Sequence, residues 1–232
     1  MSLDSYQLKT IALITMLIDH GAMAFRSHMS DSLYLLLRSV GRLSFPIFCF
    51  LLAEGFYHTR NRCHYLGRLV LFCFLSEIPF DLVLSGTSVF LDKGASLTDL
   101  MDFTSQNVFF TLVLGFAAMI IADRYQDSPL CVPAVLILFP LLGEIIRCDY
   151  GALGVLTILF FYLRKKTGRF SLGYCFIPLL ILGLNSWVQL LCLFSLPLLL
   201  CYNGEKGRGP KYLYYVAYPG HLYLYLLIKL WR

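Results

Sequence analysis

The sequence contains few charged residues. Only 14% of its 232 residues are charged and 58% are hydrophobic, whereas a soluble domain is about a quarter charged. Such a chain has too little polar surface to cover itself in water. It also lacks a long polar linker and any repeat with a period of about 20 to 50 residues, which excludes a solenoid. We therefore expect one domain, residues 1–232, integrated into a lipid bilayer.

The motifs of familiar soluble cofactor sites are also missing. There is no Walker sequence, no G-x-G-x-x-G after a strand, no H-E-x-x-H and no Cys and His set with metal-ligand spacing. None of the eight cysteines forms a C-x-x-C pair, so we expect them to act as buried small hydrophobic residues. The basic residues are scattered between apolar segments. The net charge of +5 is therefore no sign of nucleic-acid binding.

Nine apolar segments, bounded by charged residues, Gly, Pro or Asn, fill the chain. A bilayer core about 30 Å thick needs roughly 20 residues per helix, and continuous apolarity favours helices. The sequence predicts an all-α, polytopic transmembrane helix bundle of about nine helices, or eight to ten because the sixth and seventh segments are short. The segments are 6–25, 33–57, 65–84, 107–122, 130–146, 150–163, 172–184, 186–202 and 212–230.

The basic residues indicate the orientation of these segments. Short cytoplasmic loops collect Lys and Arg, and the connections after the second, fourth, sixth and eighth segments, together with Arg68 at the start of the third segment, hold eleven of the nineteen basic residues. The connection 85–106 instead holds three Asp and a single Lys. We expect a cytoplasmic N-terminus and, with nine spans, a C-terminus on the outer side.

Asp19 and His20 are the most informative polar residues. Ionisable groups inside lipid are costly unless paired or hydrated, so each is a functional candidate. Histidine is suited to take a proton from a hydroxyl or amine nucleophile near neutral pH. Neighbours on a helix point about 100° apart, so we expect Asp19 to meet another helix, with Arg42 as its partner, rather than to orient His20. A polar network that only fixes helix packing is the alternative for both.

Arg38 and Arg42 lie one turn apart in the second segment, ahead of Pro46, which should loosen or kink that helix. Arg38 either faces a cavity or extends to the outer interface. Glu54 either pairs with Arg42 across a cavity or caps the inner end of the helix with His58.

Glu77 and Asp81 lie one turn apart around Pro79. A like-charged pair at this spacing needs a cationic partner or bound water, so a salt-bridge cluster is slightly favoured over a functional role. The further candidates for substrate binding or support are Asn107, Asp149, Tyr150 and His221.

The connection 203–211 reads NGEKGRGPK. Glycine-rich backbone with Lys and Arg could cradle a phosphorylated ligand. Composition alone nevertheless favours an ordinary basic cytoplasmic loop.

Six ordered strings resemble the TraX family of polytopic membrane proteins. They are LKTIALITMLIDHG (8–21), GRLSFPIFCFLLAEGFYHT (41–59), RLVLFCFLSEIPFDL (68–82), QNVFFTLVLG (106–115), DYGALGVL (149–156) and YNGEKGRGPKYLYYVAYPGHL (202–222). The resemblance covers nearly the whole chain.

That family is associated with N-acetylation of the pilin subunit in bacterial conjugation, and it is similar to transmembrane acyltransferases that use acyl-CoA and an intramembrane histidine. The resemblance implies a bacterial inner-membrane enzyme in which His20 is catalytic, beside Asp19 and Arg42. Acetyl-CoA is the implied donor, and its phosphates suit the cytoplasmic positions Arg68, Asn203 and Lys211. Arg42 or Asn107 would stabilise the oxyanion.

The acceptor and several properties stay open at this stage. A peptide, an amino sugar or an envelope glycan fits, through an amine or a hydroxyl, and self-association is undecided. A proton-coupled transporter with an Asp, Glu and His relay is the main alternative. A structural component of a secretion or conjugation machine is the third.

Overall fold

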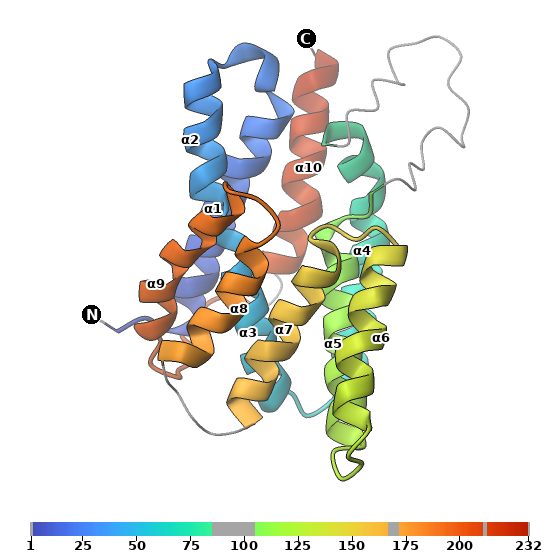
Figure 1. Cartoon of the computed structure of the whole chain (residues 1–232). Helices are drawn as coiled ribbons and strands as arrows, with labels where there is room; N and C mark the ends of the chain where they lie inside the picture. Colours follow the sequence, from blue (N-terminus) through green and yellow to red (C-terminus); the bar gives the residue numbers. More distant parts are fainter. Residues whose placement is uncertain (1, 85–104, 167–171, 211–212, 232) are drawn as a thin grey trace.

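The chain folds into a bundle of helices (Figure 1). The computed structural model describes residues 2–84, 105–166, 172–210 and 213–231. Within these ranges the backbone forms helices, their connections and two isolated bridges, which confirms the all-α class. The helices are α1 (Ser5–Ala24), α2 (Asp31–Gly41), α3 (Ser44–His58), α4 (Arg62–Val83), α5 (Val108–Arg124), α6 (Cys131–Ile145), α7 (Gly151–Lys166), α8 (Leu172–Gly183), α9 (Leu196–Leu200) and α10 (Leu213–Trp231), with 3₁₀ helices at Arg26–His28 and Gln189–Ser195.

Each predicted apolar segment corresponds to one helix or to a consecutive pair. The segment 33–57 is divided into α2 and α3, and 186–202 into a 3₁₀ helix and α9. The division after α2 has a local cause. Pro46 has no N–H to bond the Arg42 carbonyl, and the N–H groups of Arg42 and Leu43 bond carbonyls three residues back. The helix therefore breaks just ahead of the proline, as its position predicts.

Helix length alone gives one membrane-spanning candidate. Asp31–His58, taken through the break, is the one described helical segment long and apolar enough to cross a membrane. Cys131–Ile145, Gly151–Arg164 and Gln189–Leu200 are apolar but shorter. Helix length therefore neither confirms nor contradicts the prediction that several helices cross the membrane.

Helix α3 lies at the centre of the packing. It contacts α1, α5 and α7, and eleven of its fifteen residues are buried. The Phe50 ring meets Phe161 edge to face at 5.6 Å, and the Phe56 ring meets Phe116 and Tyr162 in the same way at 5.4 Å. Aromatic rings favour this geometry. The residues of α2 and α3 thus sit between the helices that contribute the other polar groups.

The beginning of α1 is fastened to the connection that follows α9. Asp4 accepts a hydrogen bond from the Gln7 N–H, and the Gln7 side chain accepts one from the Asp4 N–H, which completes a capping box. The Ser5 N–H donates to the Glu205 carbonyl at 2.8 Å. Gly207, with φ +68°, passes so close to Asp4 that a Cβ atom would lie 2.5 Å from its carboxylate. One end of the bundle therefore combines the beginning of α1 with residues 203–210 of the basic connection.

Gly115 in α5 faces α7 without room for a side chain. A Cβ atom there would lie 2.5 Å from Cδ1 and 3.0 Å from Cβ of Ile158. We expect Gly115→Ala to lower the free energy of unfolding by about 1–3 kcal/mol, the usual cost of overpacking. The matched control is Gly67→Ala in α4, where a Cβ atom meets nothing within 4 Å; it should stabilise by up to about 1 kcal/mol. Chemical unfolding measures both, and equal values would contradict this packing of α5 on α7.

Candidate active site

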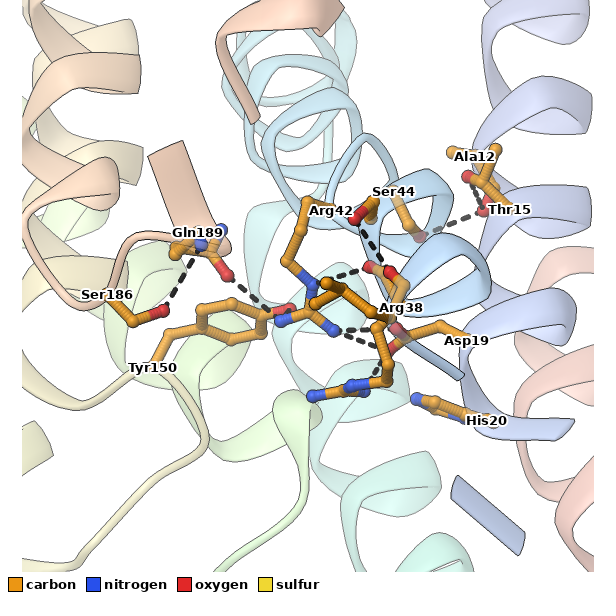
Figure 2. A network of polar contacts seen from close by, with 12 residues as sticks. Ala12, Thr15, Asp19, His20, Arg38, Arg42, Ser44, Tyr150, Ser186 and Gln189 are labelled. Carbon is orange, nitrogen blue, oxygen red and sulfur yellow. Dashed lines mark hydrogen bonds and ion pairs between the residues drawn. The ribbon is translucent and has the colours of Figure 1, made fainter. Parts of the chain in front are cut away.

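Asp19 on α1 is the centre of a buried ion-pair network (Figure 2). Its two carboxylate oxygens accept hydrogen bonds from Nη2 of Arg42 at 2.7 and 2.6 Å, and one of them also accepts from Arg38 at 2.7 Å. Asp19 is 6% exposed and Arg42 is 8% exposed. The predicted pairing of Asp19 with Arg42 is confirmed. Arg38 joins the pair instead of extending to an outer interface.

The guanidinium of Arg42 is fully used within the protein. Nε donates to the Arg38 carbonyl at 3.2 Å, and Nη1 donates to Gln189 at 2.9 Å and to the Tyr150 hydroxyl at 3.5 Å (Figure 2). Arg42 therefore joins α1, the break after α2, the 3₁₀ helix at Gln189–Ser195 and the start of α7. A buried charge held by this many partners is fixed in one position.

The approach of α2 to α1 depends on Gly41. A Cβ atom at Gly41 would collide with the Asp19 side chain. A second link lies next to it, because the Ser44 hydroxyl donates to the Ala12 carbonyl at 2.8 Å. The break between α2 and α3 is therefore held against α1 on both sides of Arg42.

Tyr150 has a strained backbone. Its φ of +64° lies in the left-handed region, which costs a non-glycine residue about 1–3 kcal/mol. The Tyr150 ring stacks on Phe45 with 3.9 Å between centroids and 2° between planes. Strain of this kind tends to persist at functional sites, where the surroundings enforce it.

His20 contacts α10 rather than the ion-pair network. Its Nδ1 lies 2.7 Å from Nε2 of His221, and the two rings are stacked with centroids 4.9 Å apart. Nδ1 of His221 donates to the Ala217 carbonyl at 2.8 Å. Tyr218 meets the His20 ring edge-on at 5.7 Å. Asp19 and His20 thus contact different helices, as their 100° separation predicts.

A cavity of about 720 Å³ extends from Asp19 and His20 along α1. Its lining includes Ser5 and Lys9 near the start of the helix, and Asp19 and His20 near its end. Fifteen residues separate Ser5 from His20, so the cavity extends about 22 Å along the helix. Asp149 and Tyr150 also line it. Its apolar walls include Phe48, Leu51, Leu52, Leu69 and Leu112.

Basic side chains line the end of the cavity away from His20. They are Lys9, His58, His64, Arg68 and Lys206. The Nε of Arg68 is buried and has no hydrogen-bond partner among the described residues. An unused charged donor is costly by itself and suits an anionic group of a ligand.

The comparisons with known proteins agree with one another. The family model for TraX protein matches residues 4–229. The chain belongs to the TraX family. It is 33% identical over 250 aligned residues to "Probable fimbrial assembly protein FimC, serogroup H1" of Dichelobacter nodosus. The alignment covers 98% of this chain and 96% of that protein. No solved structure matches. The resemblance inferred from the six strings is confirmed.

Glu54 of this TraX-family chain does not pair with Arg42. It pairs with Arg164 of α7 at 3.1 Å, and both side chains are almost fully buried. Of the two alternatives for Glu54, the pairing with Arg42 is wrong, because Asp19 already holds Arg42 and because twelve residues separate Glu54 from Arg42, or about 18 Å along helical backbone. Glu54 still lines the cavity.

Glu77 forms hydrogen bonds rather than the expected salt bridge. It accepts from the backbone N–H of Asn107 at 3.2 Å and also from the side-chain amide. That amide donates to the Cys73 carbonyl at 2.9 Å as well, and Asn107 is completely buried. Asp81 is 2% exposed one turn further along α4. Glu77 and Asn107 fix the start of α5 to α4, and the cavity lining includes neither of them.

The basic connection contributes Gly204 and Lys206 to the cavity lining, which does not include the predicted Asn203. Asn203 bonds to Glu205 within the connection. Lys211 and most of the connection 85–106 lie outside the described residues.

The sequence prediction missed Gln189, Lys9, Lys206 and Tyr218. Gln189 carried a usable signal, because it is an isolated polar side chain within an apolar segment. Lys206 carried one as well, because it lies in the glycine-rich basic connection 203–211. Lys9 carried none beyond the ordinary frequency of Lys near the ends of apolar helices.

Breaking the Asp19 pair should be costly. We expect Asp19→Asn to lower the free energy of unfolding by about 3–5 kcal/mol, because it leaves two guanidinium groups without their buried counter-charge. The control is Asp31→Asn, which removes a partner of Arg26 where the Asp31 side chain is 92% exposed; it should cost less than about 1 kcal/mol. Denaturant unfolding of both variants checks the difference. Similar small losses would show that the buried pair is not a structural centre.

Proposed function

We propose that this TraX-family protein is a membrane-embedded acyltransferase of pilus or conjugation machinery. It transfers an acetyl group from acetyl-CoA to an amine or hydroxyl of an envelope-associated acceptor. The observation that carries the proposal is the cavity, which joins His20 to the basic cluster of Lys9, His58, His64, Arg68 and Lys206. The family and the fimbrial assembly relative support the setting in pilus assembly.

Exposed apolar side chains support a polytopic membrane protein. They occur on the outer faces of many helices, where a water-soluble protein rarely exposes large apolar patches. Residues between 60% and 68% exposed include Leu36, Phe74, Ile137, Phe194 and Leu227. The five lie on α2, α4, α6, the second 3₁₀ helix and α10. Contact with lipid explains why all these helices expose apolar side chains, and it supports several membrane-spanning helices where helix length alone gives one candidate.

The basic cluster is the proposed site of the donor's phosphates. Acetyl-CoA is made in the cytoplasm and carries several negative charges at one end, with the thioester at the end of a long flexible arm. The cluster lies at the end of the bundle that the basic residues assign to the cytoplasm. The apolar walls of the cavity would surround the arm and exclude water from the thioester. The acetyl group would then reach His20.

His20 is the proposed general base. An unprotonated ring nitrogen takes the proton from the acceptor amine or hydroxyl as the acceptor's nitrogen or oxygen forms a bond to the thioester carbonyl carbon. The carbon–sulfur bond then breaks, and His20 returns the proton to the leaving sulfur of CoA. The products are the acetylated acceptor and free CoA.

Tyr218 is a better hydrogen-bond donor to the oxyanion than Arg42 or Asn107, the two residues that the sequence suggested. The cavity lining does not include Arg42 or Asn107, and both have their donors committed elsewhere. Tyr218 lines the cavity beside His20. Its hydroxyl oxygen accepts from the Val108 N–H, while its hydroxyl hydrogen has no acceptor among the described residues. Arg42 then has the role of fixing Asp19.

His20→Ala should abolish acetyl transfer. A general base contributes about 10²- to 10⁴-fold in rate, so labelled product and free CoA should fall by that factor when purified protein is given labelled acetyl-CoA and membrane extract. Binding of acetyl-CoA should change little, because His20 lies at the far end from the basic cluster. The matched control is His28→Ala, an exposed histidine that the cavity lining does not include. Near-full turnover by a correctly folded His20→Ala variant would contradict the role of general base and leave His20 with a role in helix packing alone.

Loss of charge at the basic end should weaken donor binding. Arg68→Ala and Lys206→Ala should each raise the apparent KM for acetyl-CoA about tenfold or more, because a hydrogen bond to a charged group contributes about 1.5–3 kcal/mol and each 1.4 kcal/mol is tenfold. Added salt should also weaken donor binding in the parent protein. Arg124→Ala is the control, since Arg124 is exposed at the end of α5 and does not line the cavity. An unchanged donor KM in both test variants would place the donor elsewhere.

A further inference from the structure

The contact between His20 and His221 is a hydrogen bond between two imidazole rings from opposite ends of the chain. The nitrogens are 2.7 Å apart, and His221 is 6% exposed. Tyr218 and Tyr225 meet the His221 ring edge-on from α10, each at 5.5 Å. The Tyr225 hydroxyl also donates to the Leu17 carbonyl at 3.0 Å, which fastens α10 to α1. The position of the His221 ring is therefore fixed.

The partners of His221 determine which of its nitrogens carries the proton. Nδ1 faces the Ala217 carbonyl at 2.8 Å, and a carbonyl oxygen can only accept, so Nδ1 must carry the hydrogen. In a neutral ring Nε2 then holds a lone pair. This lone pair must accept from the nitrogen that faces it, Nδ1 of His20. Nε2 of His20 is left with its own lone pair.

The alternative is a second proton on His221. It would place a positive charge in a buried site where the guanidinium groups of Arg38 and Arg42 are already close to His20, as Figure 2 shows for Arg38. The single Asp19 carboxylate is shared by both guanidinium groups, so these three groups together keep one positive charge. The neutral arrangement is therefore the favoured one.

We propose that His221 is a positioning residue, which holds His20 in the tautomer that keeps Nε2 unprotonated and ready to accept a proton. The proposal rests on the function proposed above for its catalytic consequence. Chemically, the Ala217 carbonyl and His221 take the place that a carboxylate has in a Ser-His-Asp triad, where the third group fixes the tautomer of the base. Here a neutral ring performs that task in a site where arginines hold the nearby Asp19 carboxylate.

The first test is spectroscopic and does not depend on activity. Nitrogen NMR of ¹⁵N-histidine-labelled protein, assigned with His20→Gln, distinguishes protonated from unprotonated ring nitrogens. We expect Nδ1 of His20 to be protonated and Nε2 unprotonated in the parent. In His221→Ala the preference should weaken or reverse. A parent protein with Nε2 of His20 protonated would overturn the proposal.

The second test compares two substitutions at the same position. His221→Ala should lower kcat by about 10²-fold or more, towards the roughly 10⁴-fold that a wrong tautomer costs in a Ser-His-Asp triad, with the KM for acetyl-CoA nearly unchanged. His221→Gln offers a carbonyl oxygen near the place of Nε2, and it should recover at least tenfold of that loss. A purely structural role predicts no such recovery.

Lys229→Met is the matched control on the same helix. It removes the hydrogen bond from the Lys229 ammonium to the Val83 carbonyl at 2.9 Å, away from the cavity lining, and should affect stability without changing kcat. An unchanged kcat in His221→Ala would overturn the positioning role. A parent that shows the expected tautomer but transfers no acetyl group would instead contradict the acyltransferase function and support the hydrogen-bond chain.

Discussion

The buried pairing of Asp19 with Arg42 and Arg38 is the interaction on which the rest of the site depends. Breaking such a pair by removing one partner leaves an uncompensated buried charge, so the carboxylate and its two arginines must stay together for the bundle to be stable. This requirement holds α1 against the break between α2 and α3, and through Gln189 it extends to the second 3₁₀ helix. The absence of a side chain at Gly41 allows the approach.

Two consecutive residues of α1 then have separate tasks. Asp19 faces α2 and is saturated with hydrogen bonds, so it fixes the orientation of the helix. His20 is turned about 100° from it, and its contact is His221 of α10. Because Asp19 cannot turn without breaking the ion pair, the position of His20 beside the cavity is fixed as well. The site therefore gains its rigidity from a neighbour that need not touch the substrate.

The sequence predicts the helices better than it predicts their partners. Apolar runs mark the position of each α-helix, and Pro46 marks the break after α2, because both signals are local. Asp19 and Arg42 could be paired in advance, since each needs a counter-charge of similar depth. The pairing of Glu54 with Arg164 and the contact of His20 with His221 could not be predicted. They depend on which helices become neighbours and on how each is rotated, and a single sequence carries no signal for either.

The polar groups of the chain divide according to whether the protein satisfies them. Glu54 pairs with Arg164, and Glu77 accepts a hydrogen bond from Asn107. These contacts join neighbouring helices, and this structural role is sufficient reason for a polar side chain at each position. Three of the groups that remain costly line the cavity: the unused Nε of Arg68, the Tyr218 hydroxyl and the strained backbone of Tyr150. The unused Nε2 of Gln189 and the strained backbone of Arg147 lie outside its lining. Local rules are broken mainly where function requires it. The proposed donor pocket accounts for two of these costs, with Arg68 at the phosphates of the donor and Tyr218 at the oxyanion, whereas a scaffold function accounts for neither.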